Sequence, residues 1–259
     1  MGARTKYAPG TFSWVDLTTT DQDGAKTFYG ALFGWEADDR PPGEGIAYSM
    51  MNVDGKPVAA ISTQPDMLRE ARLPPAWNSY VTVESADQTA ARAGELGGTV
   101  HAPPFDVFDA GRMAVITDPQ GAFFEIWQPN RHIGASLVNG QGLLCWNELH
   151  VPDIDSAAKF YTDLFGWDTE SIDMGGAPYV AVGVNGNDNG GIIAPQMGEP
   201  PGWVVYFGTD DIDASLATIS ELDGAVVQPP IDIGHGNRIA AAQDPQGAYF
   251  ALYEGRFDD

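Results

Sequence analysis

The sequence has a single cysteine, Cys145, among its 259 residues. An intrachain disulfide and a zinc site made of several thiolates are therefore excluded, which is usual for a protein of a reducing compartment. No run of about 18 uncharged apolar residues occurs, and the first residues lack the apolar segment and small-residue cleavage site of a signal peptide. These absences predict a cytoplasmic protein that does not insert into a membrane.

Basic residues are scarce as well. Thirteen Lys and Arg stand against 36 Asp and Glu, which gives a formal net charge of -23 at pH 7. Nucleic acid and anionic membrane surfaces repel such a chain, so we expect neither as a partner. Motifs for a phosphate-binding loop, a dinucleotide fold or a nucleophile elbow are also missing, so nucleotide binding and covalent catalysis are not indicated.

The sequence contains an internal repeat. WVDL at 14–17 recurs as WNEL at 146–149, and FYGALFGW at 28–35 recurs as FYTDLFGW at 160–167. The later motif DPQGAFF returns as DPQGAYF. Self-similarity over so long a period indicates duplicated structural units. We therefore predict three segments, namely a first domain over residues 1–133, a linker over 134–141 and a second domain over 142–259.

Each copy shows the same pattern of secondary structure twice. Residues 12–18 alternate like a strand, Asp21 is a helix N-cap, and Gly34 ends that helix. Asp54-Gly55 predicts a hairpin between two strands, and Ser85 begins the second helix of the copy. We therefore predict an α+β fold of four modules, each with the order βαβββ.

The helix sequence D-x-x-x-A-x-x-F-Y-x-x-L-F-G-W, at 21–35 and again at 153–167, and the later D-P-Q-G motif resemble the vicinal oxygen chelate superfamily. This superfamily includes glyoxalases, bleomycin resistance proteins and extradiol dioxygenases. The resemblance covers nearly the whole chain and is greatest to two-domain glyoxalase-like or hydroxylase-like members. It implies two tandem glyoxalase-like domains, in each of which a curved sheet surrounds a cavity and helices cover the opposite face.

The resemblance also implies where metal-binding members hold their ion. The corresponding positions hold Trp14, Asn78 and Glu125 in the first copy and Trp146, Val204 and Ala251 in the second. Of these six residues, only Glu125 has a side chain that normally ligates a catalytic metal. A zinc, iron or nickel site needs three or four protein ligands, which one carboxylate cannot provide. We therefore expect no family-type metal and no other cofactor. Glu125 is then either a hydrogen-bonded strand anchor or an acid–base group that faces a ligand.

Strand alternation places Asp16 of the first copy, and Glu148 and His150 of the second, on the cavity side. Glu148 and His150 lie on one strand face, so we expect their side chains to emerge about 6.5 Å apart and to share one bound molecule. An apolar cavity would favour a neutral glutamic acid and a histidine that titrates near neutrality. The candidate catalytic residues are Glu148 and His150, with Asp16 and Glu125 as the alternative pair. A single strand histidine is, however, more often structural.

Aromatic residues share the cavity side of the strands. They are Trp14, Tyr80, Phe123 and Trp127 in the first copy and Trp146, Tyr206, Tyr249 and Tyr253 in the second, with Asn78 beside them. Such rings suit a flat hydrophobic or aromatic ligand, but they also fill a small cavity by ordinary packing. We expect the second copy to be the better site, because it alone combines a histidine with a glutamate on the inward strand face.

Three functions are compatible with these features. The first is a bleomycin-resistance-like protein that binds a hydrophobic or aromatic small molecule without a metal, in antibiotic resistance or secondary metabolism. The alternative is a metal-independent isomerase, lyase, cyclase or hydroxylase-like enzyme that uses the acid–base residues. A metal-dependent glyoxalase or dioxygenase comes third. Because one chain contains all four modules, we expect a monomer, with a dimer as the alternative.

Overall fold

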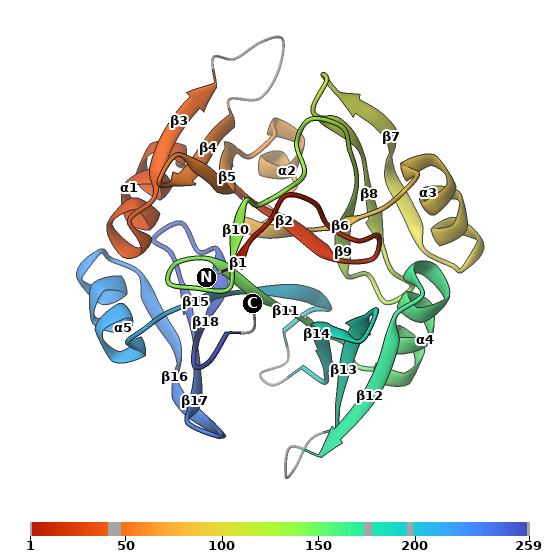
Figure 1. Cartoon of the computed structure of the whole chain (residues 1–259). Helices are drawn as coiled ribbons and strands as arrows, with labels where there is room; N and C mark the ends of the chain where they lie inside the picture. The colour runs from red at the N-terminus through yellow and green to blue at the C-terminus, as the bar shows by residue number, and fades with distance from the viewer. Residues whose placement is uncertain (1, 41–47, 174–177, 196–198, 258–259) are drawn as a thin grey trace.

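Each sequence repeat forms one eight-stranded mixed sheet in the computed structural model of Figure 1, which describes residues 2–40, 48–173, 178–195 and 199–257. The first sheet contains β2 (Phe12–Thr19), β3 (Glu36–Arg40), β4 (Tyr48–Val53), β5 (Lys56–Thr63), β6 (Ala76–Thr82), β7 (Thr99–Val107), β8 (Gly111–Thr117) and β9 (Phe123–Pro129). The second contains β11 (Leu144–His150), β12 (Asp168–Asp173), β13 (Pro178–Val184), β14 (Asn187–Ile193), β15 (Gly202–Gly208), β16 (Ala225–Gly234), β17 (Asn237–Gln243) and β18 (Tyr249–Glu254). The strand orders, β3-β4-β5-β2-β6-β9-β8-β7 and β12-β13-β14-β11-β15-β18-β17-β16, are equivalent. The predicted α+β fold of four βαβββ modules is confirmed.

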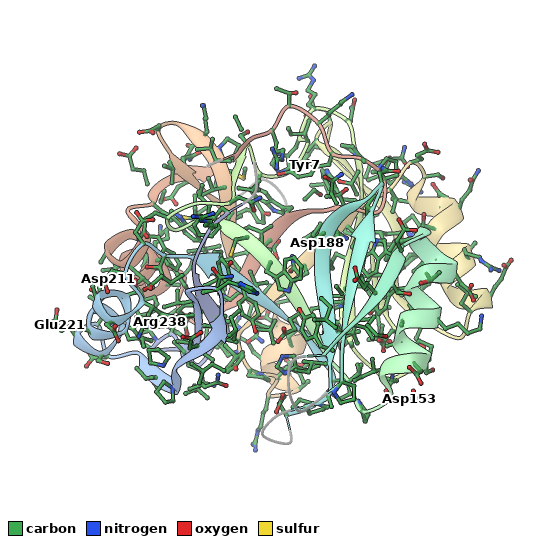
Figure 2. All side chains as sticks on the ribbon, turned by 60° about the horizontal axis from the view of Figure 1, so that its bottom comes forward. Tyr7, Asp153, Asp188, Asp211, Glu221 and Arg238 are labelled. Carbon is green, nitrogen blue, oxygen red and sulfur yellow. The ribbon has the colours of Figure 1, made fainter. Side chains whose placement is uncertain are left out.

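Four helices follow the first strands of the four modules. They are α1 (Gln22–Phe33), α3 (Ala86–Glu95), α4 (Ile154–Phe165) and α5 (Ile212–Glu221). Asp153 and Asp211, labelled in Figure 2, cap α4 and α5 by accepting backbone N–H groups at 3.0 and 2.9 Å. No helix within the described ranges has both the length and the apolar character needed to cross a membrane.

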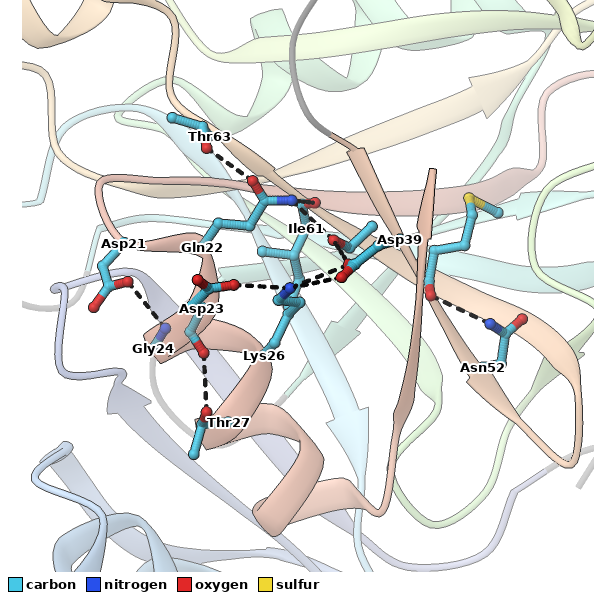
Figure 3. Close-up of polar contacts among 12 residues, drawn as sticks. Asp21, Gln22, Asp23, Gly24, Lys26, Thr27, Asp39, Asn52, Ile61 and Thr63 are labelled. Carbon is cyan, nitrogen blue, oxygen red and sulfur yellow. Dashed lines mark hydrogen bonds and ion pairs between the residues drawn. The ribbon is translucent and has the colours of Figure 1, made fainter. Parts of the chain in front are cut away.

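The ends of α1 show why local sequence specifies these helices. Asp21 accepts a hydrogen bond from the backbone N–H of Gly24 at 3.0 Å, and Thr63 of β5 donates to the side chain of Gln22 (Figure 3). Gly34 ends the helix with a φ of 72°, in the left-handed region that glycine adopts without strain. Both predicted ends of this helix are confirmed.

Short elements outside the modules tie the N-terminus to the connection between the repeats. β1 (Gly2–Ala3) pairs antiparallel with β10 (Leu137–Val138), so part of the predicted linker belongs to a small sheet. Gly134 has a φ of 110° and packs on the backbone of Ser13, where an added Cβ would lie 2.3 Å from the carbonyl oxygen. Only glycine allows this approach. A further short helix, α2 (Asp66–Glu70), precedes β6.

The helix-bearing faces of the two sheets pack together. α1 contacts α5 and α3 contacts α4, as Figure 1 shows. Phe33 of α1 packs against Phe207 of β15 with ring centroids 5.1 Å apart, and Phe124 of β9 packs against Phe160 of α4 at 6.2 Å. The first module therefore shares a hydrophobic interior with the fourth, and the second shares one with the third. We call this packing the inter-repeat core.

Two reciprocal hydrogen bonds cross the inter-repeat core. Tyr29 of α1 donates to Asp244 at 3.1 Å, and Tyr161 of α4 donates to Asp118 at 3.2 Å. The other carboxylate oxygen of each aspartate accepts two backbone N–H groups of its own D-P-Q-G turn. Each turn is thus held by a tyrosine of the other repeat. The opposite sheet faces carry the predicted cavity residues, and we call them the first and second inner faces.

Candidate functional site

The second inner face contains a buried, charged hydrogen-bond network. Glu148 and His150 of β11 are only 9% and 6% exposed, and His150 Nε2 lies 2.9 Å from Glu148 Oε1. The two side chains therefore lean together and bond directly. The prediction that the two side chains emerge about 6.5 Å apart and share one bound molecule did not include this bond, which side-chain rotation allows.

Glu199 completes this network and was not predicted. It lies in the connection between β14 and β15, and its Oε1 is 2.5 Å from His150 Nδ1. Burial lowers the pKa of His150, but hydrogen bonds and charges from Glu148 and Glu199 outweigh burial and raise the pKa above its usual value. In its protonated form the ring donates to a carboxylate on each side. The expectation of a histidine that titrates near neutrality did not include this second carboxylate, which acts to raise the pKa.

Tyrosine hydroxyls surround Glu148. Tyr206, which strand alternation places on the cavity side, donates to Glu148 Oε1 at 2.8 Å. The hydroxyl of Tyr179 on β13 is also hydrogen-bonded to Glu148 and accepts a hydrogen bond from Trp146 Nε1 at 3.1 Å. Burial, together with the negative charges of Glu199 and Glu148, raises the pKa of Tyr249 to about 12. These phenols are therefore protonated hydrogen-bond donors at neutral pH.

The first inner face has an equivalent arrangement around Asp16. This carboxylate accepts hydrogen bonds from Asn78 at 2.8 Å, Tyr80 at 2.8 Å and Tyr48 at 3.2 Å. Tyr48 in turn accepts from Trp14 Nε1 at 3.1 Å. Both repeats therefore join a tryptophan, two tyrosines and a strand carboxylate. Tyr48 and Tyr179 were not predicted as site residues. Both lie at the start of equivalent strands, β4 and β13, and this repeated tyrosine could have identified them.

Glu125 lies near Asp16 and is buried beside it. It is 5% exposed, and its Oε2 has no hydrogen-bond partner among the described residues. Burial, and to a smaller extent the charge of Asp16, raises the pKa of Glu125 well above its ordinary value. Burial also raises the pKa of Asp16, against the hydrogen bonds from its three donors. The first inner face is therefore an acidic cluster without the histidine of the second.

Chain segments cover the first inner face. Tyr7, labelled in Figure 2, donates to the carbonyl of Ala135 at 2.6 Å, and Trp127 Nε1 donates to the carbonyl of His132 at 2.8 Å. The His132 ring packs edge-on against Trp14 with centroids 4.5 Å apart. As a result Trp14 and Trp127 are only 3% and 5% exposed. Trp14 and Trp127 are therefore covered by these segments, whereas Phe123 on the same face is exposed.

The second inner face is less covered. Trp146, Tyr249 and Tyr253, which were predicted from strand parity, are all partly exposed. Tyr253 donates to the carbonyl of Arg256 at 3.2 Å. Phe123, the first-repeat counterpart of Tyr249, is the first residue of β9; it is 50% exposed and packs against the ring of His101 on β7.

Comparison with known proteins identifies the family. A family model described as Glyoxalase/Bleomycin resistance protein/Dioxygenase superfamily matches residues 11–126 and 144–252. The chain belongs to this superfamily. It is 45% identical to a candidate glyoxylase, CFP32, of Mycobacterium tuberculosis (strain CDC 1551 / Oshkosh), over 97% of both chains. It is 33% identical to the anthracycline biosynthesis protein DnrV of Streptomyces peucetius, over 97% of this chain and 96% of that relative.

Solved structures of the superfamily share the fold. The Mn(II)-bound glyoxalase from Novosphingobium aromaticivorans has a TM-score of 0.68 at 16% identity, over 96% of this chain and 84% of that one. The 2,2',3-trihydroxybiphenyl 1,2-dioxygenase from Sphingomonas wittichii strain RW1 has a TM-score of 0.66 at 13% identity, over 96% and 92%. At these identities the likeness concerns the fold alone.

The residues of this superfamily member do not fit a family-type metal. Within the described ranges, His, Cys, Asp and Glu form no group of three that could hold an ion. His150 lies between two carboxylates, but its two ring nitrogens each face a different one, so the three side chains do not converge on one point. Trp14 and Trp146 stand at the strand positions where the resemblance to metal-binding members implies a ligand, and tryptophan does not supply one. That the protein works without a metal stays a prediction.

Proposed function

We propose that the protein binds a hydroxylated aromatic small molecule on the second inner face, without a family-type metal. The observation that carries this proposal is the contrast between the two inner faces. Trp14 and Trp127 are buried under other segments, whereas their counterparts Trp146 and Tyr253 are partly exposed beside a buried charged network. A flat ring needs such an accessible aromatic surface next to fixed polar groups.

The network favours a neutral ligand with hydroxyl and carbonyl oxygens. Glu148 and Glu199 flank one imidazolium, so the three side chains carry a net negative charge that disfavours an anion. The carboxylate of Glu148 accepts hydrogen bonds from neighbouring phenols, and a ligand hydroxyl can take the place of one of them. The protonated hydroxyl of Tyr249 can donate to a ligand carbonyl. A hydroxyquinone presents both groups on one flat ring.

Two relatives support this ligand class. DnrV of Streptomyces peucetius and DauV of Streptomyces sp. (strain C5), at 33% and 32% identity, carry the name anthracycline biosynthesis protein. Anthracyclines are built on a hydroxylated anthraquinone ring system. We therefore infer a role in the metabolism of, or resistance to, an aromatic compound of this kind.

A second candidate function is metal-independent acid–base catalysis on the same ligand. The observation that favours it is the placement of Glu148 beside His150, whose pKa is raised, in a buried site. Glu148 would accept a proton from the ligand, and His150, as a positioning residue, would hold compensating positive charge next to it. Catalysis would appear as a new product by liquid chromatography, whereas binding alone leaves the ligand unchanged.

Titration with 1,8-dihydroxyanthraquinone, followed by calorimetry and tryptophan fluorescence, tests the proposal. We expect Glu148→Gln and His150→Ala each to weaken binding at least about tenfold, or about 1.4 kcal/mol, with an unchanged circular dichroism spectrum. Asp16→Asn is the matched control in the first repeat and should bind like wild type. Wild-type affinity in both second-repeat variants, together with loss in Asp16→Asn or Glu125→Gln, would place the site on the first inner face instead.

A further inference from the structure

A glycine and a tyrosine side chain lie against each other on the second inner face. Gly191 of β14 pairs with Glu148 of β11, so it lies on the same face as that carboxylate. A Cβ added to Gly191 would come within 2.9 Å of three atoms of Tyr179, namely its hydroxyl oxygen, Cζ and Cε1. The phenol end of Tyr179 therefore occupies the place that a side chain at 191 would take. A glycine inside a strand often marks such a close approach.

The equivalent positions of the first repeat carry larger side chains. The register of the strands places Ala60 where the second repeat has Gly191, and Met50 where it has Ala181. The second inner face therefore has less side-chain volume beside its carboxylate, and Tyr179 takes part of that space. Because this tyrosine is a partly exposed side chain at the start of β13, rotation about its Cα–Cβ bond can clear the space again.

The hydroxyl of Tyr179 makes both kinds of hydrogen bond that a phenol can make. It accepts from Trp146 Nε1 at 3.1 Å and is hydrogen-bonded to Glu148, whose carboxylate requires it to donate. A carbonyl or ether oxygen could not donate to Glu148, and an ammonium group could not accept from Trp146. The groups around this hydroxyl thus match a phenol, and a tyrosine of the same chain fills the place.

Tyr206 is the other phenol on Glu148, and it is enclosed. It lies on β15, between β11 and β18, and is 6% exposed. Tyr179 is by contrast the second residue of β13, which lies next to the edge strand β12, and it is partly exposed. Trp146, its hydrogen-bond donor, is partly exposed as well. Of the two phenols, Tyr179 is therefore the one that a ligand from solvent can displace.

We propose that the ligand of the second inner face is a phenol whose hydroxylated ring takes the place of the Tyr179 side chain. The ligand hydroxyl donates to Glu148 and accepts from Trp146, and the ring lies on the bare backbone at Gly191. This inference rests on the function proposed above, and it adds the position of the ligand and the group that the ligand displaces. A molecule without a phenolic hydroxyl leaves Glu148 and Trp146 without this partner, which costs affinity.

Removing the tyrosine ring should create a site for its free counterpart, p-cresol. We expect calorimetry to detect p-cresol binding by Tyr179→Ala, with toluene at least about tenfold weaker because it lacks the hydroxyl. The matched control combines Tyr179→Ala with Gly191→Ala. It places a Cβ where the hydroxyl lay, so it should lose p-cresol binding and keep the circular dichroism spectrum of Tyr179→Ala. The inference is overturned if Tyr179→Ala does not bind p-cresol, if toluene binds equally well, or if the double variant binds p-cresol as tightly.

Tyr179→Phe keeps the ring and removes only the competing hydroxyl. Its affinity for 1,8-dihydroxyanthraquinone should exceed that of wild type at least about threefold, since the ligand no longer displaces a hydrogen bond to Glu148. Tyr48→Phe, the equivalent change in the first repeat, should bind like wild type. Unchanged or weaker binding by Tyr179→Phe would contradict displacement and leave the proposed function intact.

The p-cresol experiment separates this inference from the proposed function, because it uses no anthraquinone. If wild type fails to bind 1,8-dihydroxyanthraquinone while Tyr179→Ala binds p-cresol and excludes toluene, the anthraquinone is the wrong ligand for the proposed function. The assignment of a phenol to the place of Tyr179 is supported by that result.

Discussion

Replacing Glu125 with glutamine should make the stability of the protein less dependent on pH. Glu125 is buried on β9, one of its oxygens has no hydrogen-bond partner among the described residues, and the nearest acidic neighbour is Asp16 on β2. The charge of Glu125 also acts on Tyr80 of β6 and raises the pKa of that phenol. Ionisation of Glu125 therefore places a second negative charge in a buried site, and no basic side chain of the described residues offsets it.

The magnitude follows from proton linkage. A glutamic acid in the unfolded chain titrates near about pH 4.3, and burial raises the pKa of Glu125 well above this in the folded chain. Between these two values folding takes up a proton, so the free energy of unfolding falls by up to about 1.4 kcal/mol per pH unit as pH rises. Glutamine has no such proton. The unfolding free energy of Glu125→Gln minus that of wild type should therefore increase with pH, by up to about 1.4 kcal/mol per pH unit.

Urea unfolding of both proteins, followed by circular dichroism at several values between about pH 5 and about pH 8, measures this difference. The raised pKa of Asp16 acts in both proteins and so contributes little to the comparison. Glu84→Gln, at an exposed position, controls for the loss of one negative charge. A difference between Glu125→Gln and wild type that stays constant across this range would refute the reasoning.

Three further predictions concern other parts of the molecule. The pKa of His150 is raised in the folded state, so its ion pairs stabilise the protein fully below the unfolded pKa. This contribution should be lost as pH rises through the folded pKa. In urea unfolding, His150→Gln should remove this pH-dependent loss of stability. Tyr29→Phe and Tyr161→Phe should each cost about 1–3 kcal/mol in the same assay, because each leaves a buried aspartate oxygen without its donor, and unequal costs would argue against equivalent roles. Light scattering after size exclusion should give the mass of a monomer, and a dimer mass would contradict this.

Much of the fold could be predicted because its signals are local. Asp21 and Gly34 mark the two ends of a helix by their own hydrogen-bonding and conformational properties, and the structure places both as expected. The edge strand β3 was not identified individually, because its sequence EADDR is polar and has no apolar alternation. The packing of α1 against α5 was not predicted either, since nothing in a single helix specifies which distant helix it contacts.

The candidate site could be predicted only where it lies on strands. Alternation placed Asp16, Glu148 and His150 on the inner faces. It could not locate Glu199, because the position of a loop residue depends on the whole path of the chain. Nor could it show that Glu148 and His150 bond directly, since this depends on side-chain rotation and on the second carboxylate that holds the ring from the other side.

The two repeats have many residues of the inter-repeat core in common but carry different residues on their inner faces. The tyrosines, aspartates and tryptophans that join the repeats are the same in both copies, as in the pairs Tyr29 and Tyr161 or Trp77 and Trp203. The inner faces differ, with alanine at 251 where the first copy has Glu125. A change in the core is felt by both repeats at once, whereas a change on one inner face leaves the other intact. Duplication has thus left one scaffold with two surfaces that selection, or an engineer, can alter separately.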